Sequence, residues 1–299
     1  MPALEARVKT ALDETRLLIL GAQILFGFHL NGAFQNAFGE LDAVSRGLHA
    51  TAFFLMAITI GLLIAPSMQH RIVERGQASR RILRVATVSA GMALAPFALS
   101  LGIDLFVVIG HRFGAGLGLV AGASFTVLAL VFWFGIAWRG QTSQVERPMK
   151  KVSTSLDVRV EQMLTEARVM LPGAQALLGF QLAILLTQGF ESLPEISKIV
   201  HTLALCCVAF TIILLMTPAS IHRIGYGGEN TERFFRVGSR LVIAAALPLA
   251  AGIAGDIYVA VTKALNWPQA GSLIATATAA LLAGLWIVYP FLLRRTRGA

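Results

Sequence analysis

What this sequence has least of is charge. Asp, Glu, Lys and Arg make up only 14% of its 299 residues, whereas soluble globular domains carry about a quarter. The charged residues also cluster, so that apolar runs long enough to cross a bilayer lie between them. This scarcity excludes a soluble enzyme and a disordered chain. With 56% apolar residues, the sequence predicts a multi-pass membrane protein.

Cysteine is scarce as well. The chain has two, Cys206 and Cys207, which are adjacent within one apolar run. Adjacent thiols rarely form a disulfide, so a secreted disulfide scaffold is excluded and no metal or redox centre is expected at this pair. The net charge is +9, but basic residues in a membrane chain mark cytoplasmic loops first, so we expect no nucleic-acid partner. The charged N-terminus predicts that no signal peptide is removed.

Eight apolar segments dominate the chain. Each has roughly the 20 residues that a helix needs to cross about 30 Å of hydrocarbon. Arginines gather in alternate loops and in the C-terminal tail, whereas the loops between them are short and nearly neutral. This asymmetry predicts that both termini face the cytoplasm. The segments are Leu17–Phe38, Gly47–Met68, Val85–Ile109, Phe113–Trp138, Val169–Phe190, Ile199–Ala219, Val237–Leu265 and Trp267–Leu293.

The second half of the sequence repeats the first. Glu14, His49 and Asp104 recur as Glu166, His201 and Asp256, always 152 positions further on, and many other polar residues and prolines match at the same offset. Shared hydrophobicity would not align such residues, so we infer an internal duplication. Four segments per copy give both copies one orientation, which predicts a pseudo-twofold axis along the membrane normal. The predicted domains are residues 1–138 and 156–299, joined by a cytoplasmic linker at 139–155.

The repeat also includes residues before the first apolar segment of each copy. Leu4, Val8 and Leu12 recur at the same offset, and their spacing predicts a short amphipathic helix on the inner leaflet. The predicted fold class is therefore an all-α membrane protein with eight transmembrane helices, in two parallel four-helix repeats, each preceded by such a helix. Trp133, Trp138, Trp286 and Tyr289 are predicted to form an interfacial belt.

Polar side chains within the apolar segments are the candidate site residues. Gln23, Asn31 and Gln35 follow one another with Gly27 at helical i+4 spacing, and Gln175 is the copy of Gln23. Such a stripe faces either water or another helix. We favour interhelical packing for Gln23 and Gln175, and hydration for Asn31 and Gln35.

One aspartate lies inside the third segment of each copy. Asp104 follows Ser100 on one face, about 7.5 Å from the outer end of its segment by helix rise, and Asp256 is its copy. An ionisable group in a span is costly and marks a functional candidate. His49 and His201 lie at the same level, so a His–Asp pair in each copy could shuttle protons or serve as a static hydrogen bond. We favour the static bond.

A collar of charged residues is predicted at the cytoplasmic face. We interpret it as topology signals and contacts with anionic lipids, and expect a salt bridge from Glu14 to an arginine. A ridge formed by Gly114, Gly118 and Gly122 predicts close helix packing, within the fold or in a homo-oligomer. The collar residues are Glu14, Arg16, Arg71 and Arg84 with their copies Glu166, Arg168, Arg223 and Arg236.

The motif around Glu14–Phe28 resembles that of a known family. Glu14, Arg16, the run Gly21-Ala22-Gln23 and the pair Gly27-Phe28 all recur at the same offset. The chain thereby resembles an uncharacterised bacterial, largely actinobacterial, family of four-span inner-membrane proteins of unknown function. The resemblance implies a fused tandem of that domain in the bacterial inner membrane. The two copies have also diverged, because His29 stands where the second copy has Gln181.

Three functions remain open at this stage. The first is a small-ion or proton-linked small-solute pathway near the pseudo-twofold axis, lined by the polar stripes and both aspartates. The second is a non-transporting membrane scaffold or lipid-interacting protein. The third is a b-type haem carrier that uses His49 and His201, or His70 and His222, as axial ligands. No Walker loop, metal-spaced cluster or nucleophile motif is present, so we expect no enzyme activity, metal or cofactor.

Overall fold

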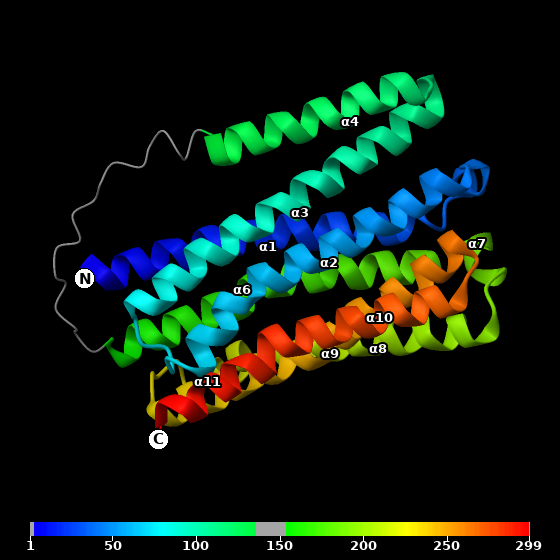
Figure 1. The fold of residues 1–299 in the computed structure, drawn as a ribbon. Helices are drawn as coiled ribbons and strands as arrows, with labels where there is room; N and C mark the ends of the chain where they lie inside the picture. Colours follow the sequence, from blue (N-terminus) through cyan, green and yellow to red (C-terminus); the bar gives the residue numbers. More distant parts are fainter. Residues whose placement is uncertain (1–2, 136–153, 299) are drawn as a thin grey trace.

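The computed structural model describes residues 3–135 and 154–298, and within them every regular element is helical. The long helices lie side by side in one elongated bundle (Figure 1). Both chain termini and the α2–α3 and α8–α9 loops lie at one end, which we call the arginine end; the remaining turns form the opposite, loop end. The elements are α1 (Ala3–Gly32), η1 (Asn36–Glu40), α2 (Ala43–Ile72), α3 (Arg80–Phe113), α4 (Ala115–Leu130), η2 (Val131–Gly135), α6 (Leu156–Ile184), α7 (Gln188–Glu191), α8 (Glu195–Ile224), α9 (Glu232–Leu265), α10 (Pro268–Ala283), η3 (Gly284–Val288) and α11 (Tyr289–Gly298).

Seven helices among the described residues are long and apolar enough to cross a membrane. They are α2, α3, α4 with its continuation to Phe134, α6, α8, α9 and the α10–α11 unit. Their exposed apolar side chains imply contact with a lipid bilayer. The helix α1 is as long as α2 but is not among the seven, although its copy α6 is. The eighth span therefore stays a prediction, as does the pseudo-twofold axis.

Equivalent positions in the two copies begin and turn helices in the same way. The hydroxyl of Ser79 accepts the backbone N–H of Ile82 at the start of α3, and its copy Thr231 does the same at the start of α9. The α3–α4 turn has a positive φ of 97° at Gly114, and the α9–α10 turn has one of 49° at Asn266, 152 positions later. Gly and Asn are the residues that tolerate this region best.

The prediction of separate amphipathic helices is wrong. The segment that carries Leu4, Val8 and Leu12 continues without a break into the apolar part of α1. These three side chains are buried against Ile82 and Ala86 at the start of α3, so protein covers the face that we expected to meet lipid. The physical reason is that α3 extends beyond its apolar stretch toward the arginine end and supplies a partner there. In the second copy, α6 is likewise one continuous helix.

The two copies meet along α1 and α6 through interlocked small and large residues. A Cβ on Gly27 would stand 2.2 Å from the Phe180 ring, and one on Gly173 would stand 1.8 Å from Oε1 of Gln23. The rings of Phe28 and Phe180 pack at a tilt of 57°, with centroids 4.7 Å apart. Side chains therefore fill the centre of this interface.

The fourth helices of the two copies are packed differently. Helix α4 packs on α3, where Gly118 and Gly122 approach the α3 backbone so closely that a Cβ would lie 2.7 and 2.5 Å from it. The glycine ridge thus acts within the fold. In the second copy, Trp286 of η3 is fully buried and donates its indole N–H to the Gly61 carbonyl of α2, at 2.9 Å. The prediction that Trp286 belongs to an interfacial belt is wrong, because its N–H has a protein partner; Trp138 and most of the linker 139–155 lie outside the described residues.

Candidate functional site

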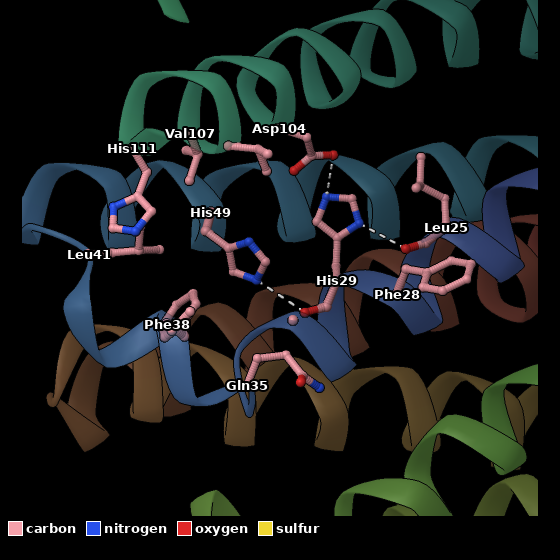
Figure 2. Close-up of a pocket in the computed structure, with 13 residues that line it drawn as sticks. Leu25, Phe28, His29, Gln35, Phe38, Leu41, His49, Asp104, Val107 and His111 are labelled. Atoms are coloured by element: carbon pink, nitrogen blue, oxygen red, sulfur yellow. Dashed lines mark hydrogen bonds and ion pairs between the residues drawn. The ribbon is translucent and has the colours of Figure 1, made fainter. Parts of the chain in front are cut away.

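Three titratable side chains meet near the loop end of the first copy. Figure 2 shows His29 of α1 pointing toward Asp104 of α3, with His49 of α2 beside them. Nε2 of His29 lies 2.9 Å from Oδ2 of Asp104. His49 donates its Nε2–H to the backbone carbonyl of His29 at 3.0 Å, so it orients the helix that carries His29.

The hydrogen bonds around the His29 ring define where its protons are. Its Nδ1 donates to the Leu25 carbonyl at 2.9 Å, because a carbonyl can only accept. Its Nε2 also lies 3.3 Å from Oγ of Ser100, which donates its own proton to the Ala52 carbonyl. The His29–Asp104 pair therefore shares one exchangeable proton, either on an imidazolium that faces a carboxylate or on a carboxyl group that faces a neutral ring.

This pair opens onto a cavity of about 450 Å³ at the loop end. The Asp104 side chain is 27% exposed, while that of His29 is 2% exposed. His111, two helical turns beyond Asp104 on α3, and Gln35 line the same cavity (Figure 2). The carboxyl group is thus open to this cavity, while the imidazole stays covered.

Asp104 also borders a second cavity, of about 450 Å³, between α1, α3 and α4. The other residues that line it are apolar, with Phe125, Phe132 and Trp133 among them. A carboxyl group at the edge of an apolar cavity favours a cation that has an apolar body. Asp104 is consequently accessible from two cavities, and in one of them every other lining residue is apolar.

The equivalent site in the second copy is closed. Gln181, His201 and Asp256 are all fully buried. The side-chain amide of Gln181 donates to both carboxyl oxygens of Asp256, at 2.9 and 2.8 Å. His201 donates to the backbone carbonyl of Gln181 at 3.0 Å. Since an amide exchanges no proton with a carboxyl group at ordinary pH, Gln181 holds α6 to α9 and takes up no proton from Asp256.

The structure corrects the predicted partner of Asp104. We expected His49 to pair with Asp104, whereas Asp104 contacts His29. In the second copy His201 does lie beside Asp256, with its Nδ1 4.0 Å from Oδ1 of Asp256. The sequence did carry a signal for His29, because it directly follows the matched pair Gly27-Phe28 and its copy is a glutamine, Gln181. Asp104 also lies deeper than expected, since α3 continues nine residues beyond it to Phe113, about 13 Å by helix rise.

The polar stripe of α1 has no single environment. Gln23 is buried at the α1–α6 interface, where its amide packs on Gly173 without a hydrogen bond among the described residues. Its copy Gln175 is exposed. Gln35 lies beyond the end of α1, is exposed and donates to Oδ1 of Asn31 at 2.6 Å. The stripe therefore lines no continuous wall.

The collar residues separate into a buried cluster and exposed side chains. Glu166 is fully buried and accepts from Nε of Arg71 at 2.7 Å, with Arg16 and His70 each 3.4 Å away. Arg71 also donates to Ser239 of α9 at 3.0 Å. The predicted Glu14 salt bridge is wrong: Glu14 is exposed, and its copy Glu166 makes the contact because it faces the interface between the copies. The other collar residues, Arg84, Arg168, Arg223 and Arg236, are exposed.

The histidines considered as haem ligands have protein partners. His70 contacts Glu166, and His222 lies 3.2 Å from Oδ1 of Asn230. Over residues 3–135 and 154–298, no group of three or more His, Cys, Asp or Glu side chains is placed to hold a metal ion.

Comparison with known proteins identifies a family whose function is unknown. The sequence profile of one family, described as a family of unknown function (DUF6328), matches the chain twice, over residues 4–137 and 151–290. The two matches correspond to the two copies. No curated protein and no solved structure matches the chain.

Proposed function

We infer a function for a chain that belongs to the family of unknown function DUF6328 and carries two copies of its domain. It is a multi-pass protein of the bacterial inner membrane, with eight spans and both termini in the cytoplasm. Its first copy binds a small cationic solute at Asp104 in exchange for a proton. The observation that carries this proposal is the contact between His29 and an Asp104 carboxyl group that is open to a cavity.

The exchange follows from competition for one carboxylate. When the pair is closed, the imidazolium of His29 is the counter-ion of Asp104. A cation that binds Asp104 replaces this counter-ion, and His29 is then left as a buried positive charge without a partner. Because an uncompensated charge in the membrane interior is costly, its Nε2 proton leaves through the loop-end cavity. Cation uptake and proton release are thereby linked.

The proposed pathway lies in the first copy and no longer at the axis between the copies. The α1–α6 interface is filled by Phe180 against Gly27 and by Gln23 against Gly173. The cavities that border Asp104 lie on the other side of α1, toward α3 and α4. Asp256, fully buried, lines neither of them.

The test is cation binding with simultaneous proton counting. Purified protein in weakly buffered detergent is titrated with tetraphenylphosphonium, and in a second series with Na⁺, while a pH dye reports released protons. We expect the organic cation to release about one proton per bound ion. Asp104→Asn should weaken binding about tenfold to hundredfold, because a charge-assisted contact is lost.

Two variants provide the matched controls. His29→Gln gives the first site the composition of the second, so cation binding should persist without proton release. Asp256→Asn removes the equivalent carboxylate from the closed site and should leave both binding and release unchanged. If Asp104→Asn binds the cation as well as wild type does, the proposal fails and the non-transporting alternative is favoured.

A further inference from the structure

The second copy has a cationic cavity at the arginine end. It lies between α6 and α8, measures about 480 Å³ and is lined by Arg168, His222 and Arg223 above an apolar floor that includes Leu171 and Leu215. Neither arginine has a carboxylate partner among the described residues. The site is separate from the one at Asp104, which is on the first copy at the loop end.

The first copy shows what this arrangement of side chains binds. The residues equivalent to Arg168, His222 and Arg223 are Arg16, His70 and Arg71, and these last three are buried. They surround the carboxylate of Glu166, with contacts of 3.4 Å from Arg16 and His70 and of 2.7 Å from Nε of Arg71. Two guanidinium groups and an imidazole at these positions thus form a binding site for an oxyanion.

In the second copy, the chain supplies no carboxylate to the equivalent arginines. By the repeat, Glu14 is the equivalent of Glu166, but it is exposed, and no ion pair joins it to the described arginines. Gly228 lies close to the Arg223 guanidinium, 4.0 Å from the position of a Cβ, so backbone borders the cavity there. The same cationic side chains are therefore present, open and without a carboxylate.

We propose that Arg168, Arg223 and His222 bind the phosphate of an anionic phospholipid. The depth of the cavity favours a lipid over a free ion. Leu215 precedes Arg223 by eight residues of α8, which places it about 12 Å further into the membrane by helix rise. A cationic rim above an apolar floor matches a headgroup above an acyl chain.

The test is lipid retention by the purified full chain. Protein in mild detergent is incubated with phosphatidylglycerol or with phosphatidylcholine and analysed by native mass spectrometry. Wild type should retain phosphatidylglycerol, and the double variant Arg168→Gln/Arg223→Gln should retain about thirtyfold less. Each arginine near a membrane surface raises the affinity for anionic lipid by about fivefold, and the variant lacks two of them. Because both arginines are exposed, the double variant should fold normally. Its thermal unfolding profile, compared with that of wild type, checks this.

Two further arms decide between the sources of the phosphate. Arg84→Gln/Arg236→Gln removes two exposed arginines of the same end that do not line the cavity, and it should retain the lipid as wild type does. Equal loss in both double variants overturns the site. An excess of inorganic phosphate should leave the lipid bound; if it displaces phosphatidylglycerol, the ligand is a soluble oxyanion and the lipid assignment is overturned.

Discussion

The two copies share a backbone plan and differ in which end they leave open. In both, a histidine of the second helix donates to the backbone carbonyl of the first helix at 3.0 Å. Yet the first copy is open at the loop end, around Asp104, and closed at the arginine end, around Glu166. The second copy is closed around Asp256 and open around Arg168 and Arg223. Duplication thus preserved helix geometry while packing and a few substitutions assigned different chemistry to equivalent places.

The neighbours of each third helix explain why the aspartates differ in burial. Helix α9 packs on α2, α6, α8 and α10, so Asp256 is enclosed on every side. Helix α3 packs on α1, α2 and α4, and α4 diverges from the rest of the bundle (Figure 1). Asp104 therefore keeps an exposed side, and only there can an exchangeable partner such as His29 be used.

The largest expected effect comes from removing the carboxylate that closes the first copy. Glu166→Gln leaves Arg71, Arg16 and His70 around a neutral group in a buried cluster, so it should destabilise the protein by about 3–5 kcal/mol. Its counterpart Glu14→Gln changes an exposed side chain and should alter stability by less than about 0.5 kcal/mol. Thermal unfolding in detergent measures both. Equal effects would mean that the two copies are closed alike.

The next effect concerns α4, which packs on α3 but diverges from the rest of the bundle (Figure 1). A Cβ on Gly122 would lie 2.5 Å from the Gly102 carbonyl, so Gly122→Val should separate α4 from α3 and cost about 1–3 kcal/mol. Gly116→Val is the matched control, because nothing lies within 4 Å of its Cβ position. Both unfolding temperatures are compared with that of wild type. A control that falls as far as Gly122→Val would exclude the close contact as the cause.

A smaller effect distinguishes the starts of α2 and α8. Asp42 caps α2 by accepting the Ser45 N–H at 2.8 Å, and this bond lowers the pKa of Asp42 from its model-peptide value of 3.8. The contribution of the cap is therefore complete above that value and is lost as the pH falls through the lowered pKa. The equivalent residue Pro194 offers no side-chain cap to α8.

Amide hydrogen exchange tests this difference position by position. On acidification, protection of the Ser45 amide should decrease relative to that of Ser197, its copy on α8, after correction for the intrinsic exchange rates. Asp42→Asn, which has no carboxyl group to titrate, should show no such relative loss. A parallel decrease at both serines in wild type would contradict the role of the cap.

The smallest expected effect is none. Gln181→His gives the second site the composition of the first, but Asp256 is fully buried and borders neither cavity at Asp104. Without access to water, the new histidine should add no proton release to the cation titration. A second released proton in this variant would show that burial is not what separates the two copies.

Part of this architecture was readable from the residues. The constant offset between Glu14 and Glu166 and between Asp104 and Asp256 predicted two copies, and the family profile matches both halves. The helical, apolar character of most segments is confirmed. The partner of Asp104 was not predicted, because depth along a helix places His29 and His49 at similar levels and only the rotation of α1 against α3 selects His29.

The environment of individual side chains was likewise not predictable from the sequence. Trp286 and Trp133 carry the same indole, but one is fully buried on Gly61 and the other is half-buried. Glu14 and Glu166 are the same residue in the same motif, but Glu166 alone faces two arginines. Periodicity defines which face of a helix a residue occupies, and it carries no information on which neighbour covers that face.

The residues by themselves determined membrane class, repeat and candidate polar groups, because hydrophobicity and self-similarity act along the chain. Tertiary structure alone decided that His29 serves Asp104, that Glu166 closes one arginine cluster and that the other stays open. The reason is that burial and ion pairing depend on how the long helices pack against one another, both within each copy and between the copies. Two related stretches of chain can therefore enclose one carboxyl group and expose its counterpart.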